Sequence, residues 1–458
     1  MLNPRLRTLW LANVVVGTAA VAVRAQRPIT TVGTRPARHA VLAWDLEVVT
    51  VTHDSVILTW TTRTRDHSGL LHPVAADTEV RIAAADGRGP SIAHYRDPEP
   101  TAYHYAEITG LEPGREYRFE AYSAGRRALP ARTLVTRRPD APETTGVFTT
   151  LTRPPGQLLR TIALTNDLHF GERGNGVLVP PRVSGLREDS GQYPEFMLEA
   201  ILDDAHAPDR AADALVVAGD LTHTGAADES RRVRAGLDTW GTFGEDYFVC
   251  RGNHDNGTGP HDHWGAYFHP RRELVVDHVD GLRLIGLDTT VPRTSRGDLD
   301  PAQLRQLGDV LRAEPDRPTL IYGHHPVTRH AAISNPGGPG FILDRAGADA
   351  LHDLYRQAPG VFLHHSGHTH RTRRSRPDSG IEVEFLEVAA AKEYPGGYML
   401  VRLYEGGYTV NFYKSRSESA RRWSTRTRRQ YLGLHPDHSF GTVADRNHVV
   451  LRDFSALN

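Results

Sequence analysis

Polar side chains that can bind metal ions recur after short apolar runs in the second half of the chain. They follow five runs in succession: Asp167 and His169 after TIALTN, Asp220 after ALVVAG, Asn253 and His254 after DYFVC, His324 and His325 after TLIYG, and His368 and His370 after VFLHHS. Carboxylates and imidazoles are suitable ligands for Mn, Fe or Zn. The pattern therefore indicates metal chemistry at the points where strands end.

Each motif has a simpler explanation when it is taken alone. Gly-Asp and Gly-Asn pairs are ordinary turn residues, and a single histidine after a strand more often makes a hydrogen bond within a turn. Five in succession are hard to attribute to turns. Residues spaced as Asp167 and His169 on an extended strand end can face one ion. The glycines before Asp220 and Asn253 let the backbone turn and approach an ion or phosphate closely.

The apolar runs alternate with helical stretches such as 194–207, where apolar residues recur on one face. This alternation predicts an α/β domain whose active loops lie at the carboxyl ends of its strands. Segments within 381–413 are expected to be closing strands of the same domain. Residues 415–458 are Arg-rich and then apolar, and they are treated as a C-terminal extension without an assigned place.

The first part of the chain has a different pattern. Residues 44–150 contain alternating runs rich in Val, Ile and Thr, which is typical of an all-β domain. The stretch Leu111-Glu112-Pro113-Gly114, followed by Tyr117, resembles the fibronectin type III signature before the tyrosine corner. The resemblance implies a β-sandwich of the fibronectin or immunoglobulin type, which binds or packs and does not catalyse.

The N-terminus has the order of a signal peptide over residues 1–25. Arg5 and Arg7 precede an uncharged run from Thr8 to Val23, and Ala25 supplies a small residue at a cleavage point. That run is short and rich in Ala and Gly for a membrane span. We expect export to the cell envelope or beyond. A surface helix or a misassigned start codon is the alternative, which leaves a cytoplasmic location open.

Composition narrows the class of protein. A chain of 458 residues is long enough for two or three domains. Its net charge of −1 gives no electrostatic case for nucleic acid or an anionic membrane as partner. The single cysteine, Cys250, excludes an intramolecular disulfide and a cysteine-based zinc site, and its apolar surroundings predict a small buried side chain. The oligomeric state does not follow from the sequence.

Taken in order, the motifs D-x-H, G-D, G-N-H-D, G-H and G-H-x-H resemble the calcineurin-like metallophosphoesterase family over residues 161 to about 413. The resemblance implies a four-layer αββα sandwich over 158–414, with two metal ions (Mn, Fe or Zn) between strand ends. It also implies hydrolysis of phosphate esters of small molecules, in which a metal-bound hydroxide attacks phosphorus.

The resemblance assigns a role to each matching position. Asp167, His169 and His370 would hold one ion, Asp220 would bridge, and Asn253, His324 and His368 would hold the second. His254 would be the catalytic neighbour, hydrogen-bonded to and oriented by Asp255. His325 would lie beside the ligands, and His364 and His365 would be structural.

One departure indicates the branch of the family. A β-module before such a domain resembles purple acid phosphatases, which have D-x-G and G-D-x-x-Y motifs with an iron-binding tyrosine. Here the first motif ends in His169, and His223 replaces the tyrosine. The site is therefore expected to be colourless and more similar to the cyclic-nucleotide and glycerophosphodiester phosphodiesterases. His223 would lie beside the ligands or face the substrate.

The substrate is left open between phosphodiesters and phosphomonoesters, with a nucleotidase- or phytase-like phosphomonoesterase as the alternative. A rival interpretation from another class is a degenerate, catalytically silent domain that binds a partner. Degeneration normally removes ligands, and none of the seven expected ligand positions is lost here. Substrate choice is expected to lie in the loops 258–270 and 329–341.

Overall fold

The computed structural model describes residues 40–87, 93–131, 139–175, 192–335, 337–376, 380–428 and 436–457. The predicted signal peptide lies outside these residues. No helix within the described part of the chain is long and apolar enough to span a lipid bilayer. The described residues divide into two compact units: the first contains those within 1–150, 174–184 and 425–438, and the second contains those within 151–173, 185–424 and 439–458.

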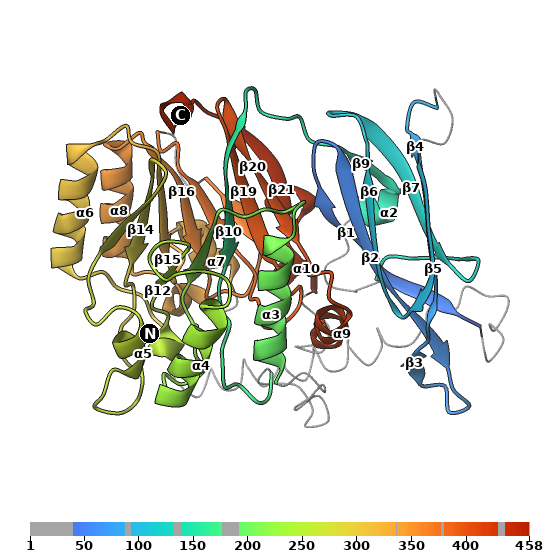
Figure 1. The fold of residues 1–458 in the computed structure, drawn as a ribbon, viewed down its shortest axis with the longest axis horizontal. Helices are drawn as coiled ribbons and strands as arrows, with labels where there is room; N and C mark the ends of the chain where they lie inside the picture. Colours follow the sequence, from blue (N-terminus) through green and yellow to red (C-terminus); the bar gives the residue numbers. More distant parts are fainter. Residues whose placement is uncertain are drawn as a thin grey trace. The chain divides into compact units, whose positions relative to one another are not determined.

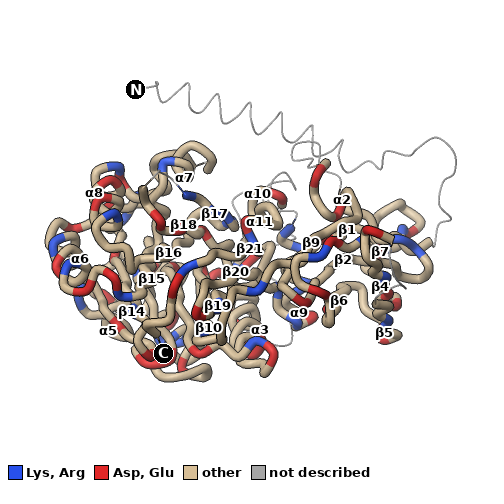
Figure 2. The backbone as a smooth tube through the Cα atoms, turned by 90° about the horizontal axis from the view of Figure 1, so that it is seen from above, with Lys and Arg blue, Asp and Glu red and all other residues tan. Residues whose placement is uncertain are grey.

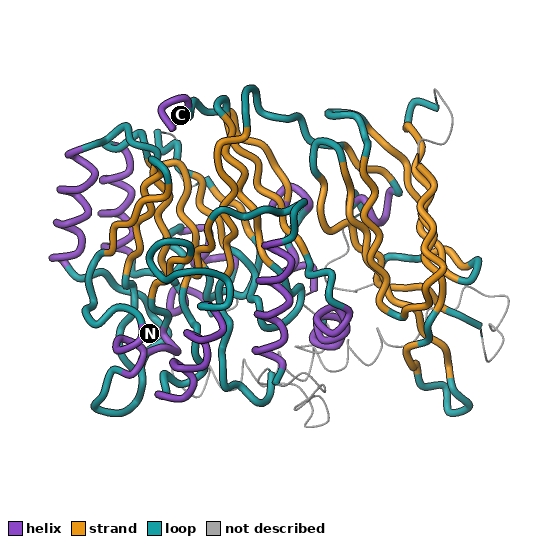
Figure 3. Tube along the Cα trace, viewed as in Figure 1, coloured by secondary structure: helices purple, strands orange, loops and turns teal. Residues whose placement is uncertain are grey.

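The described part of the first unit consists mainly of strands (Figures 1 and 3). One sheet has the order β1-β2-β3 with β6 against β2, and the other has the order β5-β4-β7-β8 with β9 against β7. The elements are β1 (Leu42–Val51), β2 (Ser55–Arg65), β3 (Leu71–Pro73), β4 (Ala76–Ala84), β5 (Ala93–Thr101), β6 (Tyr103–Thr109), β7 (Glu116–Ser123), β8 (Arg126–Arg127), α2 (Pro142–Thr145) and β9 (Val147–Thr149).

Two contacts join and brace these sheets. Trp60 of β2 is buried, and its indole N–H donates to Ser123 Oγ of β7 at 2.9 Å. The Tyr117 hydroxyl accepts a hydrogen bond from the backbone N–H of Glu112 at 2.8 Å, five residues back along the chain. This is the bond that defines a tyrosine corner. The all-β sandwich expected from the sequence is confirmed.

The second unit contains two six-stranded sheets, with the orders β12-β11-β10-β19-β20-β21 and β13-β14-β15-β16-β18-β17. The strands of the first sheet are β10 (Leu158–Thr165), β11 (Ala214–Ala218), β12 (Tyr247–Cys250), β19 (Tyr398–Tyr404), β20 (Gly407–Tyr413) and β21 (Asn447–Leu451). Those of the second are β13 (Val275–Val279), β14 (Leu282–Leu287), β15 (Thr319–Gly323), β16 (Val361–Ser366), β17 (Arg373–Ser375) and β18 (Glu384–Glu387).

The helices of this unit are α3 (Tyr193–His206), α4 (Ala227–Leu237), η1 (Asn253–Asp255), α5 (His263–Tyr267), α6 (Pro301–Ala313), α7 (Arg329–Ser334), η2 (Gly338–Phe341), α8 (Arg345–Arg356), α11 (Val443–Arg446) and η4 (Ser455–Leu457). Two more helices, α9 (Glu418–Thr427) and α10 (Pro436–Phe440), include residues of both units. Figure 1 shows α6 and α8 outside the β14–β16 sheet and α3 on the side of the other sheet. The expected layered αββα architecture is confirmed.

Apolar side chains explain this layering. Leu307 and Leu311 of α6 and Leu351 of α8 pack in one cluster with Ile285 of β14 and Ile321 of β15. Acidic and basic residues are interspersed along the described chain (Figure 2), in line with the net charge of −1. The layers therefore assemble mainly through buried apolar contacts, although a few charged side chains, such as Arg283 of β14 and Glu384 of β18, are also buried.

Part of the C-terminal extension is integral to the second unit. β21 pairs antiparallel with β20, so the apolar segment near the end of the chain completes the first sheet. Trp423 and Ala420 of α9 pack with Tyr193, Phe196 and Met197 of α3. Burial of these apolar side chains gives the segment the place that sequence patterns did not assign.

Candidate metal centre

The candidate site residues lie where the strands of both sheets of the second unit end. β10, β11 and β12 run parallel in one sheet, and β15 and β16 run parallel in the other. The carboxyl ends of parallel strands meet at the same edge of a sheet. The loops that leave these five strands therefore bring together residues that are as many as 203 positions apart, from Asp167 to His370.

The backbone at these positions differs from the expected extended conformation. Asp167, His169, Asp220, His368 and His370 all have positive φ angles, between 49° and 65°. They account for five of the ten non-glycine residues with positive φ in the described chain. The left-handed conformation costs an ordinary residue energy and concentrates at functional sites. The ligand pairs are thus presented by tight turns, and the expectation that they lie on extended strand ends is wrong.

The first cluster contains Asp167, His169 and His370, which each offer a ligand atom within 4.8 Å of the others. His370 Nε2 lies 3.2 Å and His169 Nε2 lies 3.7 Å from Asp167 Oδ1. The backbone N–H of His368 and the side-chain amide of Asn166 both donate to Asp167 Oδ2, at 3.0 and 2.5 Å. Asp167 is therefore anchored through one oxygen and presents the other to the two histidines.

The second cluster contains Asp220, His324 and His368, again with ligand atoms within 4.8 Å of one another. His324 Nε2 lies 3.1 Å from His368 Nδ1 and 3.1 Å from Asn253 Oδ1, so the asparagine joins this group. His324 Nδ1 donates to the Ala218 carbonyl at 2.9 Å. Because a carbonyl only accepts, this bond leaves Nε2 of a neutral His324 with a lone pair directed at the cluster.

Asp220 connects the two clusters. Its Oδ2 atom lies 3.5 Å from His169 Nε2 of the first cluster and 3.2 Å from His324 Nε2 of the second. Its Oδ1 atom accepts the backbone N–H of His254 at 2.8 Å. One carboxylate oxygen thus faces both groups while the other is fixed by the backbone, which is the arrangement that a bridging ligand requires.

The electrostatics of the clusters favour positive charge. Burial alone would lower the pKa values of His324 and His370, but Asp220 raises that of His324 to about 9, and Asp167 with Glu393 raises that of His370 to about 10. The pKa values of Asp167 and Asp220 lie well below the usual range, because the surrounding histidines outweigh the opposing effect of burial. Burial and His324 lower the pKa of His368 to about 3, which leaves a neutral imidazole able to bind an ion.

Unsatisfied polar atoms test whether these residues suit metal ions. Asp167 Oδ1, His169 Nε2 and His368 Nε2 are buried and have no hydrogen-bond partner. Buried polar atoms are normally paired, and each exception needs an explanation. Buried unpaired atoms also occur elsewhere in the described chain, but these three lie in the two clusters, where carboxylate oxygen and imidazole nitrogen form a donor set for transition metals. The residues therefore fit a pair of transition-metal ions.

His254 and His223 lie beside the first cluster. The rings of His169 and His254 are 4.5 Å apart between centroids, and His223 forms a further group of ligand atoms with them. His254 Nδ1 donates to the backbone carbonyl of His223 at 2.8 Å, which leaves Nε2 for another partner. Both side chains are only partly buried. Asn253 and His370 are partly buried as well, so all four side chains are accessible from outside the clusters.

Asp255 has a different role from the one expected. It does not orient His254, since its carboxylate accepts hydrogen bonds from four other donors: Gly252 N at 2.8 Å, Leu221 N at 3.2 Å, Thr222 N at 2.8 Å and Thr222 Oγ1 at 2.7 Å. The expected His254–Asp255 hydrogen bond is therefore wrong. Asp255 is completely buried and ties the loop after β11 to the loop after β12.

The remaining histidines of the motif strands make structural contacts. His325 Nδ1 bonds Thr289 Oγ1 at 2.8 Å, and its ring packs 4.7 Å from that of His368. His364 Nδ1 bonds the Tyr355 hydroxyl at 2.7 Å, and His365 Nε2 donates to the Thr165 carbonyl at 3.2 Å. His325 thus supports a candidate ligand, while His364 and His365 stabilise the sheet.

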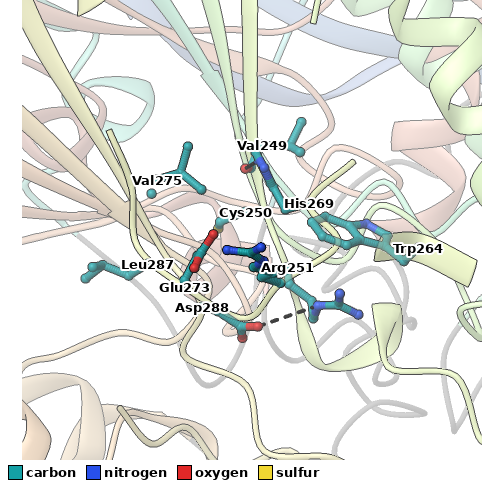
Figure 4. A pocket seen from close by; sticks show the side chains of 11 residues that line it. Val249, Cys250, Arg251, Trp264, His269, Glu273, Val275, Leu287 and Asp288 are labelled. Atoms are coloured by element: carbon teal, nitrogen blue, oxygen red, sulfur yellow. Dashed lines mark hydrogen bonds and ion pairs between the residues drawn. The ribbon is translucent and has the colours of Figure 1, made fainter. Parts of the chain in front are cut away.

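Cys250 lies in the strand behind the Asn253 loop. It lines a small pocket with Val249, Arg251 and Trp264 (Figure 4), and burial raises the pKa of its thiol well above the usual value. Arg251 pairs with Asp288 at 3.5 Å, the contact drawn in Figure 4. A buried neutral thiol is unreactive, so the structure agrees with a packing role for Cys250.

Sequence patterns missed three buried charged residues next to the first cluster, namely Glu172, Lys392 and Glu393. Glu393 Oε1 lies 2.7 Å from His370 Nδ1, and Lys392 Nζ donates to Glu172 Oε2 at 2.5 Å. One signal was present, because the chain has only two lysines, Lys392 and Lys414, among 54 basic residues. Where arginine is the ordinary cation of a chain, a lysine in an Ala-rich stretch indicates a position that arginine does not suit.

Comparison with known proteins places this site in a family. Residues 160–372, which include all seven candidate ligands, match the model of the calcineurin-like phosphoesterase family. The chain is 27% identical over 166 residues to a probable glycerophosphodiester phosphodiesterase of Arcobacter nitrofigilis, covering 35% of this chain and 57% of that protein. It is 29% identical over 167 residues to a probable cyclic nucleotide phosphodiesterase of Synechococcus sp., covering 35% of this chain and 59% of that protein.

The chain therefore spans less than two thirds of the length of these curated relatives. Among solved structures, it is similar to a dimetal phosphatase from Danio rerio, with a TM-score of 0.45, 17% identity, and coverage of 57% of this chain and 98% of that one. On the match to the family model, the second unit contains a calcineurin-like phosphoesterase domain.

Proposed function

We propose that this calcineurin-like phosphoesterase domain hydrolyses phosphodiesters of small molecules with the help of two transition-metal ions. The observation that carries the proposal is the position of Asp220 Oδ2, 3.5 Å from His169 Nε2 and 3.2 Å from His324 Nε2. A shared carboxylate between two groups of ligands is what a dinuclear centre needs, since it reduces repulsion between adjacent cations. The names of the two relatives support diesters as the substrate class.

The ligand sets proposed for the two ions follow the clusters. Asp167, His169 and His370 hold one ion, and Asn253, His324 and His368 hold the other, with Asp220 common to both. When bound, such ions polarise phosphate oxygens and lower the pKa of water. Asn253 contributes a neutral oxygen, so the site keeps enough positive charge to attract a phosphate anion.

His254 is proposed to exchange a proton with the leaving oxygen at Nε2. Its Nδ1–H is held by the His223 carbonyl at 2.8 Å, which fixes the ring orientation. Burial lowers the pKa of His254, although Asp220 acts in the other direction. His223 is proposed to face the substrate from the same side as His254, because both rings are partly exposed next to His169.

Metal analysis and the variant Asp220→Asn test this proposal together. The purified protein should contain close to two transition-metal ions and hydrolyse bis(p-nitrophenyl) phosphate faster than p-nitrophenyl phosphate. Asp220→Asn keeps the size of the side chain and an acceptor for His254 N, but it removes the shared charge. We expect it to bind fewer than two ions and to lose at least about 10³-fold in rate, a loss of about 4 kcal/mol in transition-state stabilisation.

Asp309→Asn is the matched control, because it makes the same charge change at an exposed position on α6, where the side chain of Asp309 is 71% accessible. It should keep both ions and the full rate. Full esterase activity in metal-free protein would contradict the proposal. A preference for the monoester would be consistent with the metal centre but would contradict the proposal that diesters are the substrate class.

A further inference from the structure

Three charged side chains lie on the outer side of the first cluster, where no ligand role was assigned. Glu172, Lys392 and Glu393 are each no more than 6% exposed, and we call them the Glu–Lys–Glu group. Glu172 comes from the loop after β10, whereas Lys392 and Glu393 come from the loop between β18 and β19. Burying charges is costly unless they are paired. Their presence next to two candidate ligands therefore needs an explanation.

The geometry relates the Glu–Lys–Glu group to His169 and His370. The ring of His370 spans two carboxylates, with Nδ1 at 2.7 Å from Glu393 Oε1 and Nε2 at 3.2 Å from Asp167 Oδ1. His169 has the same orientation, with Nδ1 at 3.7 Å from Glu172 Oε2 and Nε2 at 3.5 Å from Asp220 Oδ2. In each ring, Nδ1 faces an outer carboxylate and Nε2 faces a carboxylate of the two clusters.

Lys392 connects the group. Its Nζ atom donates to Glu172 Oε2 at 2.5 Å. Burial would lower the pKa of Lys392, but Glu393 and Glu172 outweigh this effect and raise it, so the side chain is a cation. One ammonium and two carboxylates therefore lie behind the two histidines.

Anchoring of the loop does not explain these side chains. The loop is held through the backbone, since the Lys392 carbonyl accepts from Trp423 Nε1 at 2.7 Å and Ala391 N donates to the Asn166 carbonyl at 3.0 Å. Any residue at position 392 would provide that carbonyl. The side chains of Lys392 and Glu393 are instead directed toward Glu172 and His370.

We propose that Glu172, Lys392 and Glu393 are positioning residues for the first metal ion. Glu393 holds His370 with its proton at Nδ1 and its lone pair at Nε2. Glu172 lies 3.7 Å from His169 Nδ1, beyond hydrogen-bond distance, and acts on that ring through its charge. Lys392 keeps Glu172 in place and limits the negative charge. Carboxylates that accept from the outer N–H of a ligand histidine set the tautomer and strengthen metal binding. The second cluster differs, because His324 Nδ1 donates to a backbone carbonyl.

The inference rests on the proposed metal centre, and Glu393→Gln tests it. The variant keeps an acceptor for His370 Nδ1 but removes the charge. Stripped protein would be titrated with Zn²⁺ and with Co²⁺ against a competing chelator. We expect one of the two ions to bind roughly 10- to 100-fold more weakly and the visible spectrum of the Co²⁺ protein to change, while the second ion binds as in the unchanged protein. Glu393→Asp, which restores the charge, should recover part of the affinity.

Glu384→Gln is the matched control. Glu384 is also a buried carboxylate paired with a histidine, since its Oε1 lies 2.5 Å from His448 Nε2, but it contacts no candidate ligand. It should lower the melting temperature and leave metal affinity and the Co²⁺ spectrum unchanged. Lys392→Met provides a second variant in the Glu–Lys–Glu group and should also weaken a single ion.

The outcomes are distinguishable. The inference would be overturned if Glu393→Gln and Lys392→Met left both metal affinities unchanged. It would also be overturned if these variants, like Glu384→Gln, lowered only the melting temperature. A protein that binds two ions but hydrolyses no phosphate ester would reject the proposed function and leave the positioning role standing. A protein that binds neither Zn²⁺ nor Co²⁺ would overturn both.

Discussion

The glycine of the Gly252-Asn253-His254-Asp255 motif offers the sharpest test of how the site is built. A Cβ atom at Gly252 would come within 2.1 Å of Asp220 N, 2.2 Å of Asp220 Oδ1 and 2.8 Å of Asp220 Cα. Ordinary contact begins at 3.4 Å, so the closest approach falls short by 1.3 Å against backbone that has little freedom to move. The substitution Gly252→Ala therefore pushes the proposed bridging residue out of place.

The expected loss of stability follows from the contacts that Gly252→Ala would disturb. Forcing an extra methyl into a packed site costs about 1–3 kcal/mol. The same movement strains two bonds to carboxylates, Gly252 N to Asp255 Oδ2 and His254 N to Asp220 Oδ1, both 2.8 Å long. Each such bond contributes about 1.5–3 kcal/mol. With partial loss of these bonds we expect a decrease of about 3–5 kcal/mol in the free energy of unfolding, or roughly 10 °C in melting temperature.

The outcome is measured by calorimetry with and without metal, by metal analysis and by hydrolysis of bis(p-nitrophenyl) phosphate. Gly259→Ala is the matched control, because it makes the same change seven residues later in the same loop region, where a Cβ would meet nothing within 4 Å. It should leave metal content unchanged and stability within about 0.5 kcal/mol. If Gly252→Ala behaved like Gly259→Ala, the close approach of Gly252 to Asp220 would not be a requirement of the site.

Two further outcomes concern single side chains. His254→Gln should retain both metal ions, because His254 is not in either ligand set. Its rate should fall about 10²–10⁴-fold, as expected for an acid–base residue. A rate near that of the unchanged protein would refute the catalytic role of His254. Tyr117→Phe removes only the hydroxyl that accepts from Glu112 N at 2.8 Å, so it should lower the free energy of unfolding of the first unit by about 1 kcal/mol and leave hydrolysis unchanged; an effect on hydrolysis would contradict this assignment.

The positions of the ligands along the chain could be predicted because the motif residues and the strands are both local features. Asp220 follows an unbroken buried strand, β11, and His324 follows another, β15, so strand alternation was sufficient to place them at strand ends. Layering of two sheets and the tyrosine corner at Tyr117 were expected from family resemblances, which short motifs carried. Each depends on patterns a few residues long, such as alternation, turns and apolar runs.

What sequence patterns missed depends on contacts between distant segments. Lys392 and Glu172 are 220 positions apart, and no local pattern relates them. The resemblance paired Asp255 with its sequence neighbour His254, but the buried carboxylate instead accepts from backbone N–H groups at positions 221 and 222. Unpaired N–H groups in a buried loop need an acceptor. That need depends on the folded loops, and adjacency along the chain does not reveal it.

The corrected role of Asp255 explains how strained turns can hold ligands in register. Left-handed residues cost about 1–3 kcal/mol each and persist only when the surroundings fix them. Asp220 is fixed from two sides, since His254 N donates to its Oδ1 and Asp255 holds the two residues that follow it. Gly252 leaves the space for this contact, and Asp255 supplies the hydrogen bonds. Gly252 and Asp255, the outer residues of the motif, thereby stabilise the loop structure. Asn253 and His254 remain available for chemistry.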